Sequence, residues 1–141
     1  MGTDSEYRSL CSQRNSAESQ RAAANNTIEE CQYKIRRLQN AKETLAAQKG
    51  AFKTLKNTDK ETIESKGSDW IGQNFKDFQS KGNELMTEND NYYTNSLDAA
   101  LDAINNEITR LQNMIYEKYG LIGRLTSWIN SLSNKIENFF N

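Results

Sequence analysis

The sequence predicts an all-α protein: an elongated antiparallel helical hairpin with a Trp-x-Gly turn and an extended C-terminal helix. Three observations support this. Apolar residues recur every seventh position over long stretches, as they do in helices that pack on helices. The 141 residues include no Pro and only seven Gly, so few positions oppose a helix. Hydrophobic residues make up 35% of the chain and charged residues 26%, which suits narrow apolar stripes better than a thick globular core.

The first helix is expected over about residues 4–57. Thr3 and Glu6 have the spacing of a capping box at its start. Asn57 and a second capping box, Thr58-x-x-Glu61, predict a break, followed by a short turn helix and loop over 58–69. The helix is predicted from a ladder of seven residues: Leu10, Ala17, Ala24, Cys31, Leu38, Leu45 and Phe52.

The second helix is expected over about 70–140. Its apolar ladder keeps one phase across Gly120 and Gly123, although each glycine costs about 1 kcal/mol inside a helix. One long helix with a bend at 120–123 is therefore favoured. The alternative is a third helix that folds back at the two glycines and covers the first helix.

The hairpin core follows from pairing the two ladders. A turn centred near 62–68 makes the numbers of facing residues sum to about 130, so Phe52 should meet Phe78 and Cys31 should meet Leu97. The predicted core residues are Leu10, Cys31, Leu38, Leu45, Phe52, Phe78, Leu85, Leu97, Ile104 and Leu111.

In that register the N-terminal end of the first helix lies opposite Lys118. Residues 121–140 then extend beyond the first helix and have no helix beside them. This is the most apolar stretch of the chain, and an uncovered apolar face of this size usually marks an interaction site. The predicted partner-binding residues are Leu121, Ile122, Leu125, Trp128, Ile129, Leu132, Ile136, Phe139 and Phe140.

The composition argues against catalysis. The chain has no His, and neither of its two cysteines has a metal-binding neighbour. Cys11 and Cys31 lie twenty residues apart on one predicted helix, roughly 30 Å, which excludes a bridge between them. We expect no enzyme activity, no catalytic or metal site and no cofactor. The near-neutral net charge of −1 gives no reason to expect nucleic acid as a partner.

No secretory leader or membrane-length apolar run is visible, so we expect a cytoplasmic protein without a cleaved signal peptide. The helix over 121–140 could seek a membrane surface, but its polar side holds mainly Ser and Asn rather than Lys and Arg. Membrane contact is therefore not expected.

The bend has a distinctive motif. Trp70, Gly72 and Phe75 form the turn motif within Ser68-Asp69-Trp70-Ile71-Gly72-x-x-Phe75, and Tyr93-x-x-x-Leu97-x-x-x-Leu101-x-x-Ile104 follows on the second helix. With a long helix on either side, the chain resembles the WXG superfamily of type VII secretion. It more closely resembles the YwqH-like helical proteins of Gram-positive bacteria, which are associated with LXG-domain toxins.

The resemblance implies a small targeting factor that binds the helical N-terminal region of an LXG-domain toxin and promotes its export, with a second small helical protein as a further candidate partner. One feature departs from the superfamily. The export signal Tyr-x-x-x-Asp/Glu is missing, since Tyr92 and Tyr93 are followed at that spacing by Ser96 and Leu97. Export would then depend on the partner's signal. The alternative function is a structural coiled coil that self-associates into a homo-oligomer.

Overall fold

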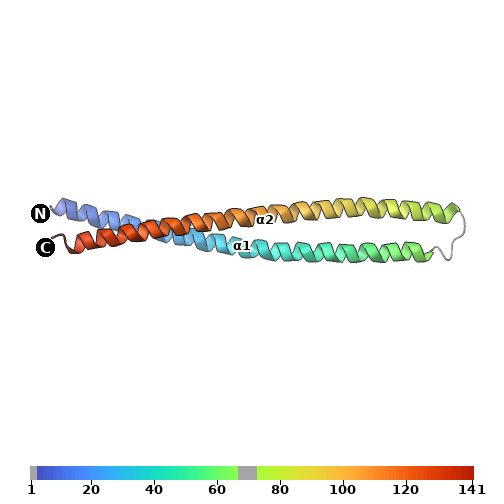
Figure 1. The fold of residues 1–141 in the computed structure, drawn as a ribbon, viewed down its shortest axis with the longest axis horizontal. Coiled ribbons are helices and arrows are strands. Elements are labelled where there is room, and N and C mark those ends of the chain that lie inside the picture. The colour runs from blue at the N-terminus through green and yellow to red at the C-terminus, as the bar shows by residue number, and fades with distance from the viewer. Residues whose placement is uncertain (1–2, 67–72) are drawn as a thin grey trace. The chain divides into compact units, whose positions relative to one another are not determined.

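The computed structural model describes residues 3–66 and 73–141, and the side chains of 3–61 and 76–141. The described residues form two helices, α1 (Asp4–Lys66) and α2 (Gln73–Glu137). The chain divides into two compact units. Unit 1 comprises Met1–Arg37 and Glu107–Asn141, and unit 2 comprises Leu38–Asn106. In each unit a part of α1 pairs with an antiparallel part of α2 (Figure 1), which confirms the predicted all-α helical hairpin.

The predicted start of the first helix is confirmed in detail. The backbone N–H of Thr3 donates to Glu6 Oε2, and the backbone N–H of Glu6 donates to Thr3 Oγ1, both at 3.2 Å. This reciprocal pair satisfies two backbone donors that no helical carbonyl can reach.

The predicted break at Asn57 is wrong. α1 continues without interruption to Lys66. The hydroxyl of Thr58, which was expected to cap a new helix, instead donates to the backbone carbonyl of Thr54 at 3.1 Å, as threonine does inside a helix. The second helix begins at Gln73 and ends at Glu137, close to its predicted bounds, and it passes through Gly120 and Gly123 as one element. Within the described residues 73–141, no third helix folds back at the two glycines.

The predicted register is wrong, and this is the largest correction. In unit 1 the Cys31 thiol lies 3.4 Å from the sulfur of Met114, and Arg21 donates to Thr126 at 3.4 Å. In unit 2 the rings of Phe52 and Tyr93 lie 4.9 Å apart. The residue numbers in these pairs sum to between 145 and 147 rather than about 130.

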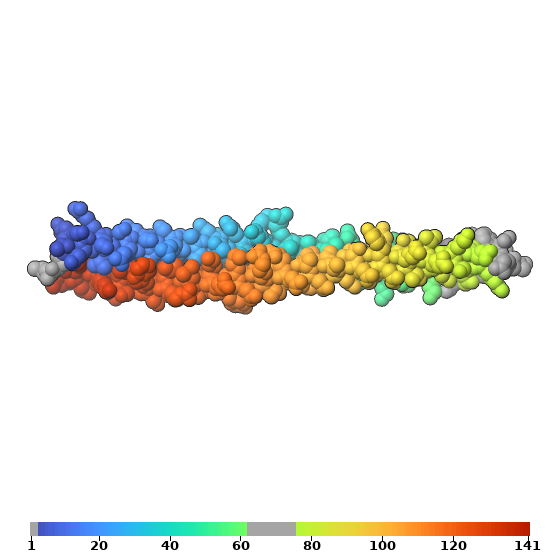
Figure 2. All heavy atoms as spheres, turned by 90° about the horizontal axis from the view of Figure 1, so that it is seen from above, coloured from blue at the N-terminus to red at the C-terminus, as the bar shows by residue number. Residues whose placement is uncertain are grey.

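The buried core lies in unit 1. All the buried hydrophobic side chains among the described residues belong to it, and none belongs to the described part of unit 2. Figure 2 shows the beginning of α1 packed along the end of α2 in this unit. The buried residues are Ala17, Ala24, Ile28, Cys31, Ile35, Leu111, Leu125, Ile129 and Leu132.

The other predicted core residues differ in how far they are buried. Leu10, Leu38, Leu45, Phe52, Leu97 and Ile104 are half-buried on the inner faces of the helices. Phe78 and Leu85 are exposed, so their assignment to the core is wrong. The reason is a change of phase: Phe78, Leu85 and Tyr92 follow one another in steps of seven positions, but Leu97 comes only five positions after Tyr92. The two ladders therefore occupy different faces of α2.

Candidate functional site: an open groove in unit 2

The predicted turn motif lies at the edge of what the structure describes. Trp70 and Gly72 fall outside the described residues. Phe75 belongs to α2, but its side chain is not among those described. The role of these three residues in closing the hairpin stays a prediction.

The segment 121–140 does not overhang. Leu125 and Ile129 form a buried cluster with Ala17 of α1, and Leu121 packs against it. Near the chain ends, the ring of Tyr7 contacts the rings of Phe139 and Phe140 at 5.5 and 5.2 Å. The expectation that nothing intramolecular covers this segment is therefore wrong, because the true register carries α1 alongside it.

The individual residues of this segment have different environments. Leu125, Ile129 and Leu132 are core residues and unavailable to a partner. Leu121, Ile122, Ile136 and Phe139 are half-buried between the helices. Trp128 and Phe140 remain exposed, at 42% and 60% of their surface. Partner binding through these two side chains stays a prediction.

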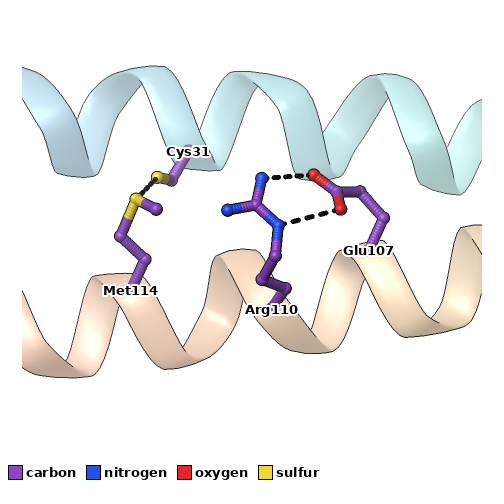
Figure 3. A network of polar contacts seen from close by, with 4 residues as sticks. All are labelled: Cys31, Glu107, Arg110 and Met114. Carbon is purple, nitrogen blue, oxygen red and sulfur yellow. Dashed lines mark hydrogen bonds and ion pairs between the residues drawn. The ribbon is translucent and has the colours of Figure 1, made fainter.

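Two polar pairs lie close together in unit 1, Arg110 with Glu107 and Cys31 with Met114 (Figure 3). Arg110 and Glu107 lie one turn apart on α2. The Arg110 guanidinium donates two hydrogen bonds to the Glu107 carboxylate, Nε to Oε2 at 2.9 Å and Nη2 to Oε1 at 2.5 Å. The Arg110 guanidinium lowers the pKa of the Glu107 carboxyl, and the carboxylate raises the pKa of Arg110. Beside them the Cys31 thiol donates to the Met114 thioether. Both cysteines are free, as predicted.

Unit 2 contains a different arrangement, an apolar groove along one side of the helix pair. Two hollows define it, and Phe52 and Leu55 of α1 line both. Leu55 is 61% exposed although it is a large aliphatic side chain. The groove lining is mainly apolar and includes four polar side chains, Gln48, Lys56, Asp59 and Asn89. The full lining is Gln48, Ala51, Phe52, Leu55, Lys56, Asp59, Met86, Asn89, Tyr93 and Leu97.

A second apolar row lies next to the groove on α2. Leu85 and Tyr92 are 60% and 69% exposed, and each precedes a groove residue, Met86 or Tyr93. The Tyr92 and Tyr93 rings meet edge to face at 5.4 Å. We call Phe78, Leu85 and Tyr92 the outer row. With the groove residues beside it, the outer row forms a continuous exposed apolar surface on α2 in unit 2, larger than single exposed apolar residues would form.

Two ion pairs hold α1 to α2 within unit 2. Lys49 contacts Asp98 at 2.5 Å, and Lys56 contacts Asp90 at 2.9 Å. Lys49 and Lys56 belong to the same seven-residue column as Ile28 and Ile35. In unit 1 this column therefore holds buried isoleucine, and in unit 2 it holds lysine. Lys56, supported by the Thr94 hydroxyl, lowers the pKa of the Asp90 carboxyl. Since these side chains are partly exposed, the ion pairs contribute little stability.

The described side chains form no candidate metal site. Across residues 3–61 and 76–141, no three His, Cys, Asp or Glu side chains are placed to hold a metal ion. Within the described helices, no stretch has the length and hydropathy of a membrane span. The groove of unit 2 offers an apolar docking surface.

Sequence reasoning missed the groove, although a signal for it was present. Met86, Tyr93 and Ala100 form a seven-residue column one position after the outer row. This column faces α1, since Tyr93 contacts Phe52, whereas the adjacent outer row is exposed, so the apolar face of α2 is wider than packing on α1 alone requires. Leu55, three residues past Phe52, extends the ladder of α1 toward the same side.

Comparison with curated proteins and with solved structures found no significant match. The family model for YwqH-like proteins matches residues 12–134, which include most of α1, all of unit 2 and most of α2. This chain therefore belongs to the YwqH-like family.

Proposed function

We propose that this chain is a non-enzymatic helical targeting partner that binds the N-terminal helical region of an LXG-domain toxin and promotes its export by a type VII secretion system. Membership of the YwqH-like family supports the general class. The observation that carries the proposal is the open apolar groove of unit 2, where Leu55, Met86 and Tyr93 offer a helical partner a surface that the chain itself leaves uncovered.

The proposed partner is protein rather than a small molecule, nucleic acid or membrane. Small-molecule pockets usually enclose most of their ligand and place a few polar groups with care, whereas the two hollows are open and mainly apolar. The protein needs no cofactor in this role. It would act in the cytoplasm and leave the cell, if it does, together with the toxin.

Co-expression tests the proposal. The full-length chain is produced together with the LXG-domain protein encoded beside it, and the pair is purified through a tag on the toxin. We expect a stable stoichiometric complex in light scattering, and reduced toxin export from cells that lack this chain. An LXG-domain protein from an unrelated locus is the control. A well-folded chain that forms no complex with its neighbour would overturn the proposal.

The same groove supports a second candidate, a structural coiled coil that self-associates. A second copy could cover the exposed Leu55 and Tyr93 side chains as a toxin helix would. Mass measurement of the purified chain separates the two functions. A stable homodimer that persists in the presence of the toxin favours the structural role.

A further inference from the structure

One seven-residue column of α1 supplies three cations that contact α2. Arg21 donates to the Thr126 hydroxyl in unit 1, and the two lysines of the unit 2 ion pairs stand further along the same column. We call this column the inner column, and its members are Arg14, Arg21, Ile28, Ile35, Lys42, Lys49 and Lys56. Each cation that contacts α2 is therefore preceded, seven residues earlier, by another cation.

Two cations of the inner column have no such contact. The Nε atom of Arg14 is buried and has no hydrogen-bond partner among the described residues. Lys42 forms no ion pair with any side chain that the structure describes. Arg14 lies seven residues before Arg21, and Lys42 lies seven residues before Lys49. Both would gain a partner if α1 moved by one heptad along α2.

This slip, roughly 10 Å along the helix axis, would give Arg14 the contact that it lacks. Arg21 and Thr126 face each other in the present register, and their numbers sum to 147. After the slip the sum is 140, so Arg14 would replace Arg21 beside the Thr126 hydroxyl. The interhelical hydrogen bond of unit 1 would be transferred rather than lost.

The ion pairs of unit 2 would survive the same slip. Lys42 would replace Lys49 beside Asp98. Lys49 would then replace Lys56 beside Asp90. Both ion pairs would be kept, so the charges of unit 2 do not distinguish the present register from the slipped one.

Other shifts by whole heptads would break these contacts. One heptad in the opposite direction brings Ile28 to Thr126. Two heptads in the same direction bring Ile35 to Asp98. An isoleucine offers neither a hydrogen bond nor a charge to these groups. Only a slip of one heptad in one direction keeps all three contacts.

The ends of the helices at the bend agree with the slipped register. α1 ends at Lys66 and α2 begins at Gln73, and the two numbers sum to 139. Since Lys56 and Asp90 sum to 146, the present register leaves about the first two turns of α2 beyond the end of α1. The slip would bring Gln73 opposite Lys66. α1 and α2 each run unbroken through both units, so the helices would slip in both units together.

The opposite end of α2 holds the contacts that favour the present register. The ring of Tyr7 contacts the rings of Phe139 and Phe140 there. The slip would remove both contacts, because Asp4 at the start of α1 would then lie opposite position 135. Ile136, which is half-buried at present, would be uncovered with the two phenylalanines.

We propose that this hairpin has two registers one heptad apart, and that the slip between them covers or uncovers the apolar residues at the C-terminal end of α2. The present register satisfies the rings at the chain ends. The slipped register satisfies Arg14 and Lys42 and aligns the helix ends at the bend. This goes beyond the proposed function, because it holds whatever partner the groove of unit 2 takes.

Intrachain disulfides in the full-length chain report each register. Every reporter carries Cys11→Ser and Met114→Cys. Retaining Cys31 reports the present register, in which the sulfur atoms at 31 and 114 lie 3.4 Å apart. Ala24→Cys with Cys31→Ala exchanges two small buried side chains and reports the slipped register. In the present register, positions 24 and 114 are out of step by roughly 10 Å, which exceeds the Cα separation of about 7 Å that a disulfide allows.

A matched control separates slipping from local opening of the helices. Leu38→Cys with Cys31→Ala places a thiol one heptad from position 31 on the other side, where the proposed slip does not bring it to position 114. Mild oxidation of dilute protein should form the 24–114 disulfide roughly tenfold or more faster than the 38–114 disulfide. Circular dichroism should show equal helicity in all reporters. No 24–114 disulfide, or equal rates for the two, would overturn the inference.

Substitutions that act on one register provide a second test. Lys42→Gln should slow formation of the 24–114 disulfide about two- to fivefold, because it removes an ion pair that only the slipped register forms. Tyr7→Gln should speed it by at least about the same factor, because it removes ring contacts that only the present register makes. Lys53→Gln, outside the inner column, should leave the rate unchanged. A rate that does not respond to Lys42→Gln would contradict the second register.

The locked chains test the consequence for the C-terminal end. Hydrogen exchange over 133–140 should be roughly threefold or more faster in the chain locked by the 24–114 disulfide than in the chain locked by the 31–114 disulfide. The reason is that the slipped register leaves the end of this segment without α1 beside it. Equal protection of 133–140 in the two locked chains would show that the slip uncovers nothing, and the proposal would fail.

Discussion

At the scale of single residues, exposure separates side chains that hold the fold from those available to a partner. Leu111 is 1% exposed in unit 1, whereas Leu55 is 61% exposed in unit 2. Leu111→Ala should lower the free energy of unfolding by about 2–5 kcal/mol, because it removes buried methyl groups and leaves a cavity. Leu55→Ala is the matched control and should change it by less than about 0.5 kcal/mol. Urea unfolding measures both, and equal effects would contradict the assignment of the core.

Asp90 should titrate abnormally. The pKa of its carboxyl is lowered by the Lys56 ammonium and the Thr94 hydroxyl. The folded-state pKa therefore lies below the unfolded value of about 3.9. The pair stabilises the fold above that value, and its contribution is lost as the pH falls through the lowered folded pKa.

Carbon-detected NMR should show this low midpoint for Asp90 in the unchanged chain. Lys56→Gln should move the midpoint upward, whereas Lys53→Gln, which removes a lysine outside the ion pair, should leave it in place. An Asp90 midpoint that does not respond to Lys56→Gln would show that the ion pair is not formed in solution.

The glycines of α2 offer a stabilising substitution. A Cβ at position 123 would meet nothing within 4 Å, and the residue is helical. Gly123→Ala should therefore raise the free energy of unfolding by about 0.5–1 kcal/mol through helix propensity. Thermal unfolding followed by circular dichroism measures the gain. A lower midpoint would indicate that the helix bends at this glycine in solution.

At the scale of elements, the register can be tested by cross-linking in unit 1. In a Cys11→Ser background, Met114→Cys places a thiol opposite Cys31, where the sulfur atoms now lie 3.4 Å apart. Mild oxidation should join the two positions within one chain. Leu121→Cys is the control, because it lies one heptad, roughly 10 Å, further along α2. Efficient cross-linking of Cys31 to position 121 instead would refute the register.

The sequence allowed the elements to be predicted but not their alignment. The capping box at Thr3 and Glu6, the apolar ladder of α1 and the unbroken phase across Gly120 and Gly123 all have local causes, and all were confirmed. A seven-residue repeat looks the same after a shift of one or two heptads, so the ladders alone could not select between registers. The placement of the predicted break at Asn57 therefore decided the pairing, and it was wrong.

The same limit explains the misplaced partner site. An error of about two heptads in the register left 121–140 without a covering helix and concealed the groove around Leu55 and Tyr93. A column of apolar residues can be assigned to the outer face of a helix only after the register has shown which columns face the partner helix.

At the scale of the whole molecule, the two units should differ in local stability. Among the described residues, burial of apolar side chains is confined to unit 1, while the inner side chains of unit 2 are only half-buried and its ion pairs add little stability. Hydrogen exchange followed by mass spectrometry should therefore be roughly tenfold or more slower in 14–35 and 108–132 than in 41–61 and 76–104, after correction for intrinsic rates. Addition of a groove-binding partner should slow exchange in unit 2. Uniform protection of the free chain would contradict this division.

The location of the core has a consequence for how the chain folds. Ala17 must meet Leu125 and Ile129, more than a hundred residues later in the sequence. Contacts between such distant residues carry a large loop-closure entropy and slow the folding of a domain that would otherwise form quickly from local helical contacts. During synthesis, α1 would leave the ribosome long before the residues that bury it are made. Up to that moment its apolar ladder is exposed, and a chaperone or a waiting partner could reach it.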